Sequence, residues 1–218
     1  MGREFIDIFE DWAKTYDESV GGNNLEYREV FENYESILNA VAENSNGVVL
    51  EFGVGTGNLS TKLLQAGHQV VGIEPSKSMR DVASKKLPNL KLLEGDFLSF
   101  PELPHQVDTI TSTYAFHHLT DVEKETAIQR YFDILPIGGK IVFGDTMFKS
   151  EEVKEAFIQN AKDKGYNNLA EDLAREYYPT IEFLRNIFIK FNFDVRFKQM
   201  NDFVWLVTAI KSVSAKTN

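Results

Sequence analysis

Residues 48–59 carry the feature that most constrains the fold of this chain. A run of apolar and β-branched residues leads into three glycines at alternate positions, Gly53, Gly55 and Gly57, and a helical pattern follows at once. Glycine adopts positive φ at little cost and lets a ligand approach the backbone. The first N–H groups of a helix lack partners within it and suit an anion. The stretch therefore predicts a buried parallel strand, a tight turn and a helix beside a ligand.

An acidic residue at the end of the next predicted strand indicates that this ligand contains a ribose. Residues 70–74 form an apolar run that ends in Glu74. A carboxylate at the tip of the second strand of a nucleotide-binding α/β unit can accept hydrogen bonds from both ribose hydroxyls. The dinucleotide fingerprint G-x-G-x-x-G would need glycine at Asn58. A nicotinamide-dependent (NAD) oxidoreductase is therefore the weaker interpretation.

Together these residues resemble the class I S-adenosylmethionine (SAM)-dependent methyltransferases. Residues 51–57 read E-x-G-x-G-x-G, similar to motif I of that family, and Glu74 looks like its ribose-binding acid. The resemblance extends over residues 1–211 and is nearest to the YrrT-like methyltransferases of bacilli. It implies an α/β fold with a doubly wound, Rossmann-like, seven-stranded sheet of order 3-2-1-4-5-7-6, whose seventh strand is antiparallel. It also implies methyl transfer with SAM as the donor.

The resemblance implies further cofactor contacts. Asp96 follows a predicted strand at residues 90–94, where the family has an acid that accepts from the adenine amino group, and Phe97 would pack on or beside the ring. By itself, Gly95-Asp96 could also be an ordinary turn. Tyr114 ends a predicted strand at residues 107–114, whose tip faces the transferable methyl group in this fold. The predicted cofactor-binding residues are Gly53, Gly55, Gly57, Glu74, Asp96, Phe97, Tyr114 and Tyr16.

Three polar side chains are candidates for a catalytic role: Tyr114, His117 and His118. In-line methyl transfer depends mainly on alignment and on exclusion of water. A base matters only when the acceptor must lose a proton early, so a structural role for both histidines stays open. Asp145 ends a predicted strand at residues 141–145, but the preceding strand ends in Tyr114. The oxygen cluster that Mg²⁺ prefers is therefore missing, and we predict no metal.

Two segments outside the central pattern are expected to cover the site. Residues 4–19 place Phe5, Ile8, Phe9, Trp12, Ala13 and Tyr16 at helical spacing. The segment is followed by a possible hinge at Gly21-Gly22, and residues 25–43 repeat the helical pattern. We expect an N-terminal helical cap with Tyr16 at the cofactor. Residues 150–178 predict a helical lid, in which Phe157, Tyr166, Tyr177 and Tyr178 either line a pocket or pack the lid onto the domain.

The predicted organisation is a single domain over residues 1–218. Residues 1–45 form N-terminal helices, 46–147 the SAM-binding core, 148–178 the lid, and 179–211 a helix and a hairpin. The chain has 23 Lys and Arg against 33 Asp and Glu, a net charge of −10. Such a surface repels phosphate backbones, which disfavours nucleic-acid partners and an RNA methyltransferase.

Composition limits the remaining alternatives. The chain has no cysteine, which excludes a thiol nucleophile and agrees with a reducing cytoplasm. No apolar run is long enough to span a membrane. We therefore expect a cytoplasmic monomer or homodimer that methylates a small-molecule acceptor. A non-catalytic SAM-binding protein remains the main alternative.

Overall fold

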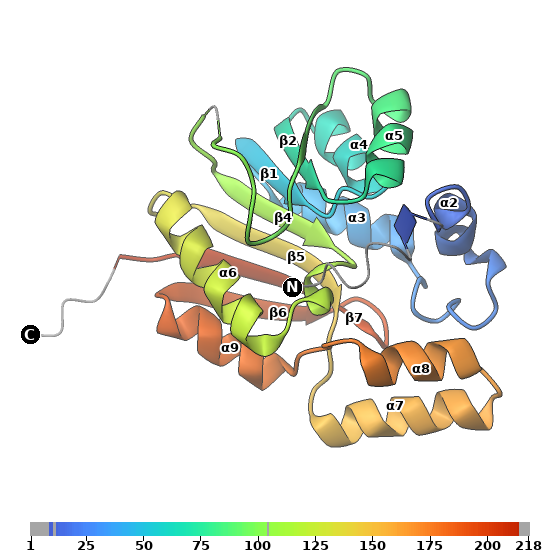
Figure 1. Ribbon diagram of the computed structural model, residues 1–218. Helices are drawn as coiled ribbons and strands as arrows, with labels where there is room; N and C mark the ends of the chain where they lie inside the picture. Colours follow the sequence, from blue (N-terminus) through green and yellow to red (C-terminus); the bar gives the residue numbers. More distant parts are fainter. Residues whose placement is uncertain (1–8, 11, 104, 214–218) are drawn as a thin grey trace, which may run out of the picture.

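The described residues form one mixed sheet with helices on both faces (Figure 1). The computed structural model describes residues 9–10, 12–103 and 105–213, so the predicted packing of Phe5 and Ile8 lies outside it. The strand order is β3-β2-β1-β4-β5-β7-β6, and only the pairings of β7 are antiparallel. This confirms the predicted α/β fold. The strands are β1 Val48–Phe52, β2 Gln69–Glu74, β3 Lys91–Glu94, β4 Thr109–Thr113, β5 Lys140–Thr146, β6 Phe193–Gln199 and β7 Val204–Lys211.

Both faces of the central strands are apolar because helices cover both of them. In β1, Val49 packs with α3 and α4, whereas Leu50 belongs to a second cluster that includes residues of α6 and α9. Buried parallel strands are expected to be apolar on both faces for this reason. None of the described helices is long and apolar enough to cross a membrane. The helices of these layers are α3 Tyr34–Asn44, α4 Asn58–Gln65, α5 Lys77–Lys86, α6 Asp121–Ile134 and α9 Ile181–Lys190.

The insert after β5 is a helical hairpin. It contains α7 Glu151–Asp163 and α8 Asn167–Arg175, which are joined at Gly165, as the turn signals predict. Its two ends meet, because Phe148 and Thr180 form a parallel β-bridge. The Phe148 N–H donates to the Pro179 carbonyl at 3.1 Å, and the Ile181 N–H donates to the Phe148 carbonyl at 2.9 Å. The two ends of the hairpin are thus bonded to each other just after β5.

The single helix predicted over residues 25–43 is wrong in its first half. Turns occupy residues 25–33, and α3 begins only at Tyr34, after Asn33 in the left-handed region at φ +61°. Contacts with the insert explain the break, since they outweigh the local helical pattern. The Glu26 carboxylate accepts the Asn168 N–H at 2.9 Å and the Leu169 N–H at 3.1 Å. These are otherwise unpaired donors at the start of α8.

The continuous helix predicted over residues 4–19 is also interrupted within the described part. Residues 13–15 form a turn, and a short helix, α2 Tyr16–Glu18, runs into a wide turn, η2 Ser19–Asn23. Gly22 lies in this turn at φ +87°, which agrees with the predicted break. The segment lies beside α3, α4 and α5 in Figure 1. It therefore reaches the carboxyl ends of β1 and β2, where the glycine-rich loop begins.

Candidate active site

The glycine-rich loop leaves β1 and enters α4 through three glycines with positive φ. The angles are +67° at Gly53, +55° at Gly55 and +86° at Gly57. A Cβ at Gly53 would lie 2.8 Å from Cβ of Ala115, whereas a Cβ at Gly55 would meet nothing within 4 Å. Gly53 and Gly55 line the cavity described below.

Gly57, the third glycine that is predicted to bind the cofactor, has different surroundings from Gly53 and Gly55. It is not among the residues that line the cavity. It forms the N-cap of α4, and a Cβ there would lie 3.1 Å from the side chain of Leu87, at the end of α5. A glycine at position 57 therefore lets α4 begin with positive φ and lets it pack closely against the end of α5. Gly57 thus supports the loop but does not line the cavity.

Glu74 stands at the tip of β2 beside the same loop. Its two carboxylate oxygens accept the Gly55 N–H and the Ser76 N–H, each at 2.8 Å. Burial is the main cause that raises the pKa of Glu74, to about 7. The carboxylate is thus fixed in orientation and lines the cavity, where it can accept further hydrogen bonds from a ligand hydroxyl.

Asp96 and Phe97 follow β3 and form another part of the cavity wall. One Asp96 oxygen accepts the N–H groups of Leu98 at 2.8 Å and Ser99 at 2.7 Å, which closes a turn. The ring of Phe97 stacks on Phe52 at 5.3 Å between centroids. The turn that Gly95-Asp96 suggests is therefore present, and it places a carboxylate and an aromatic ring side by side at the cavity.

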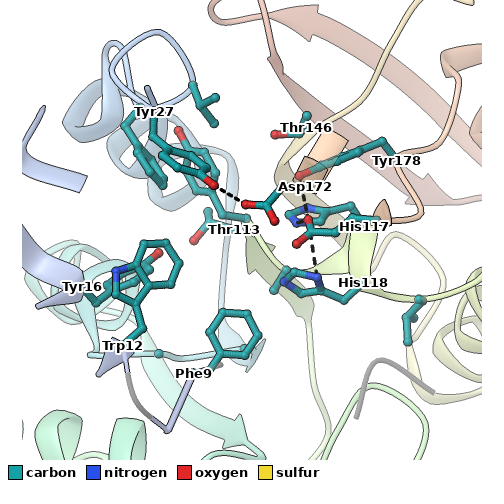
Figure 2. Close-up of a pocket in the computed structure, with 18 of the residues that line it drawn as sticks. Phe9, Trp12, Tyr16, Tyr27, Thr113, His117, His118, Thr146, Asp172 and Tyr178 are labelled. Atoms are coloured by element: carbon teal, nitrogen blue, oxygen red, sulfur yellow. Dashed lines mark hydrogen bonds and ion pairs between the residues drawn. The ribbon is translucent and has the colours of Figure 1, made fainter. Parts of the chain in front are cut away.

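One cavity of about 200 Å³ joins these residues to the tip of β4. Figure 2 shows Trp12 and Tyr16 on one side of it and His117 and His118 on the other. Tyr16 lines this cavity, as the prediction requires. The N-terminal segment and the insert thus both contribute walls. The lining also includes seven further aromatic side chains: Phe9, Tyr27, Phe31, Phe97, Tyr114, Tyr178 and Phe203.

Two acids that no sequence motif marks tie the N-terminal segment to the cofactor side. Glu10 accepts hydrogen bonds from the hydroxyls of Ser76 at 2.9 Å and Ser78 at 2.5 Å, just after β2. The hydrogen bond from Ser78 is the largest cause of its lowered pKa. Asp17 accepts from the Thr56 hydroxyl, within the glycine-rich loop, at 2.6 Å. The segment is therefore bonded to both loops that frame Glu74.

Tyr114 follows β4 in the left-handed region at φ +52°. Its ring contacts those of Phe31 and Tyr34, with centroids 5.2 and 5.5 Å away. Its hydroxyl is buried and has no hydrogen-bond partner among the described residues. Burial raises the pKa of this hydroxyl well above 10, so it stays protonated and suits hydrogen-bond donation, not proton abstraction.

His117 and His118 form a short 3₁₀ turn, η3 Phe116–His118, directly after Tyr114. Asp145, at the end of β5, accepts the His117 backbone N–H at 2.9 Å and lies 2.5 Å from its Nδ1. Burial opposes the charge on His117, but Asp145 and Glu176 together raise its pKa to about 9. Burial and the neighbouring His117 lower the pKa of His118 to about 3. The two rings therefore differ in charge although they are adjacent in sequence.

The insert supplies four polar residues that the sequence does not single out as a group: Asp172, Arg175, Glu176 and Tyr178. Asp172 accepts a hydrogen bond from the Tyr27 hydroxyl (Figure 2). Burial opposes ionisation of Glu176, yet the hydrogen bond from His117 lowers its pKa to about 2. Of the four aromatic residues weighed for the lid, Tyr178 lines the cavity, whereas Phe157 packs against the ring of Phe203. Both suggested roles of the lid aromatics therefore occur.

Comparisons with known proteins agree with this architecture. A family model described as a methyltransferase domain matches residues 49–139. An uncharacterized methyltransferase of Oceanobacillus iheyensis is 59% identical over 97% of this chain and 99% of its own length. The uncharacterized methyltransferase YrrT of Bacillus subtilis is 52% identical over 97% of this chain and 100% of its own length.

A solved structure from Thermotoga maritima has a similar fold. It is described as a SAM-dependent methyltransferase and possible histamine N-methyltransferase. The TM-score is 0.69 at 21% identity, and the match covers 94% of this chain and 99% of the other. This likeness extends beyond the central domain to nearly the whole of both chains.

Proposed function

This chain belongs to the YrrT-like family of SAM-dependent methyltransferases, and we propose that it transfers the methyl group of SAM to a small-molecule acceptor. The observation that carries the proposal is the cavity itself. The same space is lined by Gly55 and Glu74 at one end and by Tyr114, His117 and His118 at the other. A donor and an acceptor bound at the two ends would lie next to each other.

The donor end fits the groups of SAM one by one. Glu74 offers a buried carboxylate to the ribose hydroxyls, and Gly55 leaves space where a side chain would block the approach. Asp96 and Phe97 provide a carboxylate and an aromatic wall for adenine. Tyr16 and Trp12, in edge-to-face contact at 5.0 Å, would cover the bound donor and exclude water. Two observations support these roles: all of these residues line the cavity, and their side chains match the hydroxyls and the ring of SAM.

The acceptor end favours a small molecule. Its lining combines aromatic rings with polar side chains of the insert, and it forms one end of the cavity of about 200 Å³. An end that the insert encloses in this way suits a compact ligand. The net charge of −10 opposes nucleic-acid binding. Methyl transfer requires a lone pair of the acceptor in line with the bond between the methyl carbon and the sulfonium sulfur. Positioning and exclusion of water supply much of the acceleration of such a reaction.

The test is methyl transfer to an unidentified acceptor. The purified protein is incubated with SAM carrying an isotopically labelled methyl group and with a fractionated extract of bacterial metabolites. We expect S-adenosylhomocysteine to form together with one labelled compound in the small-molecule fraction. Label in RNA or protein instead would refute a small acceptor. Tight SAM binding without any turnover would favour the non-catalytic alternative, and reduction of NAD would favour an oxidoreductase.

A further inference from the structure

Three potential metal ligands meet at the acceptor end of the cavity. His117, His118 and Glu176 each present one ligand atom, and these atoms all lie within 4.8 Å of one another. The Nε2 atom of His117 lies 3.2 Å from Oε2 of Glu176, and Nδ1 of His118 lies 3.8 Å from the same oxygen. Both histidines are buried, and all three residues line the cavity. The distances of 3.2 and 3.8 Å are of the size found between ligand atoms that share one Zn²⁺ ion.

The surroundings fix the orientation of these ligands. Asp145 lies 2.5 Å from Nδ1 of His117, so the other ring nitrogen is the one directed at Glu176. A carboxylate behind a histidine is the arrangement that orients metal-bound imidazoles in proteins. Tyr178 stacks on the His117 ring at 4.6 Å and donates its hydroxyl to Oε2 of Glu176 at 2.7 Å. The second oxygen of Glu176 faces Arg175 at 4.0 Å.

A buried lysine holds the two ligand-bearing segments together. Lys124 of α6 donates a hydrogen bond to the carbonyl of Leu119, directly after His118. It also donates to the carbonyl of Tyr177, directly after Glu176, at 2.6 Å. The histidine turn and the end of the insert are therefore joined through the backbone on either side of the ligands. This rigid support reduces the reorganisation that binding an ion would require.

The arrangement needs a positive charge between the imidazoles and Glu176. If Nδ1 of His117 donates to Asp145, a neutral ring would direct its Nε2 lone pair at a carboxylate oxygen 3.2 Å away. A lone pair directed at a buried carboxylate is costly unless a cation lies between the two. Either a proton on His117 or a metal ion at the focus of the three ligand atoms meets this demand. An ion at that focus would also contact Nδ1 of His118, which lies 3.8 Å from the same oxygen.

We propose that His117, His118 and Glu176 bind one divalent transition-metal ion of the Zn²⁺ type, with an open coordination position toward the cavity. Two imidazoles and one carboxylate are a known ligand set of catalytic zinc sites, which keep a further position for water or substrate. The prediction of no metal considered the oxygen ligands that Mg²⁺ prefers. It did not bring Glu176 of the insert next to the two histidines.

The consequence for catalysis rests on the proposed function, whereas ion binding does not. An acceptor hydroxyl or thiol in the open position would lose its proton more readily, as water does on zinc. The proton would leave to solvent, and the resulting lone pair would attack the methyl carbon of SAM. The bond from that carbon to sulfur would break, and its electron pair would stay on the sulfur as S-adenosylhomocysteine forms. The inference thus points to an acceptor with a hydroxyl or thiol group.

The first test measures metal binding without any substrate. Chelator-treated protein is titrated with Zn²⁺ by calorimetry and in competition with a chromophoric chelator. We expect one equivalent of Zn²⁺ to bind. Asp145→Asn should weaken binding by roughly 10- to 100-fold, as outer-sphere changes do, and His118→Ala and Glu176→Gln should weaken it more. The double variant His68→Ala/His105→Ala removes the other two histidines of the chain and should bind as the native protein does.

A second measurement keeps the proposal falsifiable if a site variant does not fold. Native protein loaded with Co²⁺ should show the visible absorption of a low-coordinate ion with nitrogen ligands, and Zn²⁺ should abolish it in a 1:1 ratio. Absence of stoichiometric binding, or equal binding in folded site variants, would overturn the proposal and leave His117 as a protonated ion-pair partner. SAM binding is measured on the same samples. A protein that binds SAM but no Zn²⁺ refutes the metal site only, and one that binds Zn²⁺ but transfers no methyl group refutes the function only.

Discussion

The replacement Glu74→Gln isolates the charge that the site offers to a ribose. Glutamine keeps the size of the side chain and one acceptor oxygen, so one of the two backbone hydrogen bonds, from Gly55 or from Ser76, can persist. Alanine would leave both buried N–H groups without their partner and would mix loop damage with ligand loss. The glutamine variant should therefore keep its fold while it loses the ionised acceptor.

The expected loss follows from the two contacts that a ribose diol would make. A hydrogen bond to a charged group contributes about 1.5–3 kcal/mol, against about 0.5–1.5 kcal/mol for a neutral one. Replacing the charge under two hydroxyls should then cost about 2–3 kcal/mol, or roughly 30- to 150-fold in the dissociation constant of SAM. Because burial raises the pKa of Glu74 to about 7, the carboxylate forms fully only above that pH. Affinity of the native protein should rise with pH up to about 8 and then level off.

The assay is a thermodynamic cycle, in which the binding of two ligands is measured on the native protein and on the variant. Calorimetry compares S-adenosylhomocysteine with its 2′-deoxy analogue on the native protein and on Glu74→Gln. The native protein should discriminate between them by about tenfold, and the variant by much less, with a flat pH profile. The reasoning is refuted if the folded variant discriminates as strongly as the native protein. Thermal unfolding of both proteins provides the control for structure.

Four further results are expected. Gly55→Val should abolish SAM binding, because φ is +55° and the added side chain would enter the cavity; Gly165→Val, equally strained at φ +74° and with open space around it, should bind normally. SAM should slow amide exchange across residues 12–19, and Asp17→Asn should reduce that protection by removing the charged acceptor of Thr56; protection independent of SAM would contradict this. A gel shift with tRNA or duplex DNA at low salt should show no binding, given the net charge of −10. Burial raises the pKa of Glu51 to about 8 from 4.5, so the folded state holds a proton that the unfolded state has lost. Stability should therefore fall by about 1 kcal/mol per unit as pH rises through this window, and Glu51→Gln should flatten the profile in chemical denaturation.

The central sheet, and the presence of the glycine-rich loop and Glu74 at one cavity, could be predicted because their signals are local. The run into Gly53 and the acid at Glu74 each lie within a few residues of the turn that they form. The acceptor side depends on contacts between distant segments, and these leave no pattern. Glu176 reaches the two histidines only because the end of the insert returns to the chain just after β5, where Phe148 pairs with Thr180.

In the N-terminal region, a helical pattern that is present in the sequence led to a wrong prediction of structure. Apolar residues at helical spacing continue through residues 25–33, yet the chain forms turns there and passes through Asn33 at φ +61°. Tyr27 and Glu26 bond to α8 instead of completing a helix. Periodicity identified which side chains are apolar, but the insert determined what they pack against. A helix prediction made without knowledge of the insert could not include that competition.

The bridge between Phe148 and Thr180 makes the insert an exchangeable module. The chain enters the insert at Phe148 and leaves it at Thr180, and these two residues are neighbours. Lengthening or replacing the segment between them therefore changes the entropy of closing this loop only slightly and does not shift the register of the strands. Replacement would exchange Asp172, Glu176 and Tyr178 in one step while β1, β2 and the glycine-rich loop stay as they are. If the proposed function holds, grafting another hairpin together with its partners Glu26 and Tyr27 would change the acceptor end of the cavity and leave the glycine-rich loop in place.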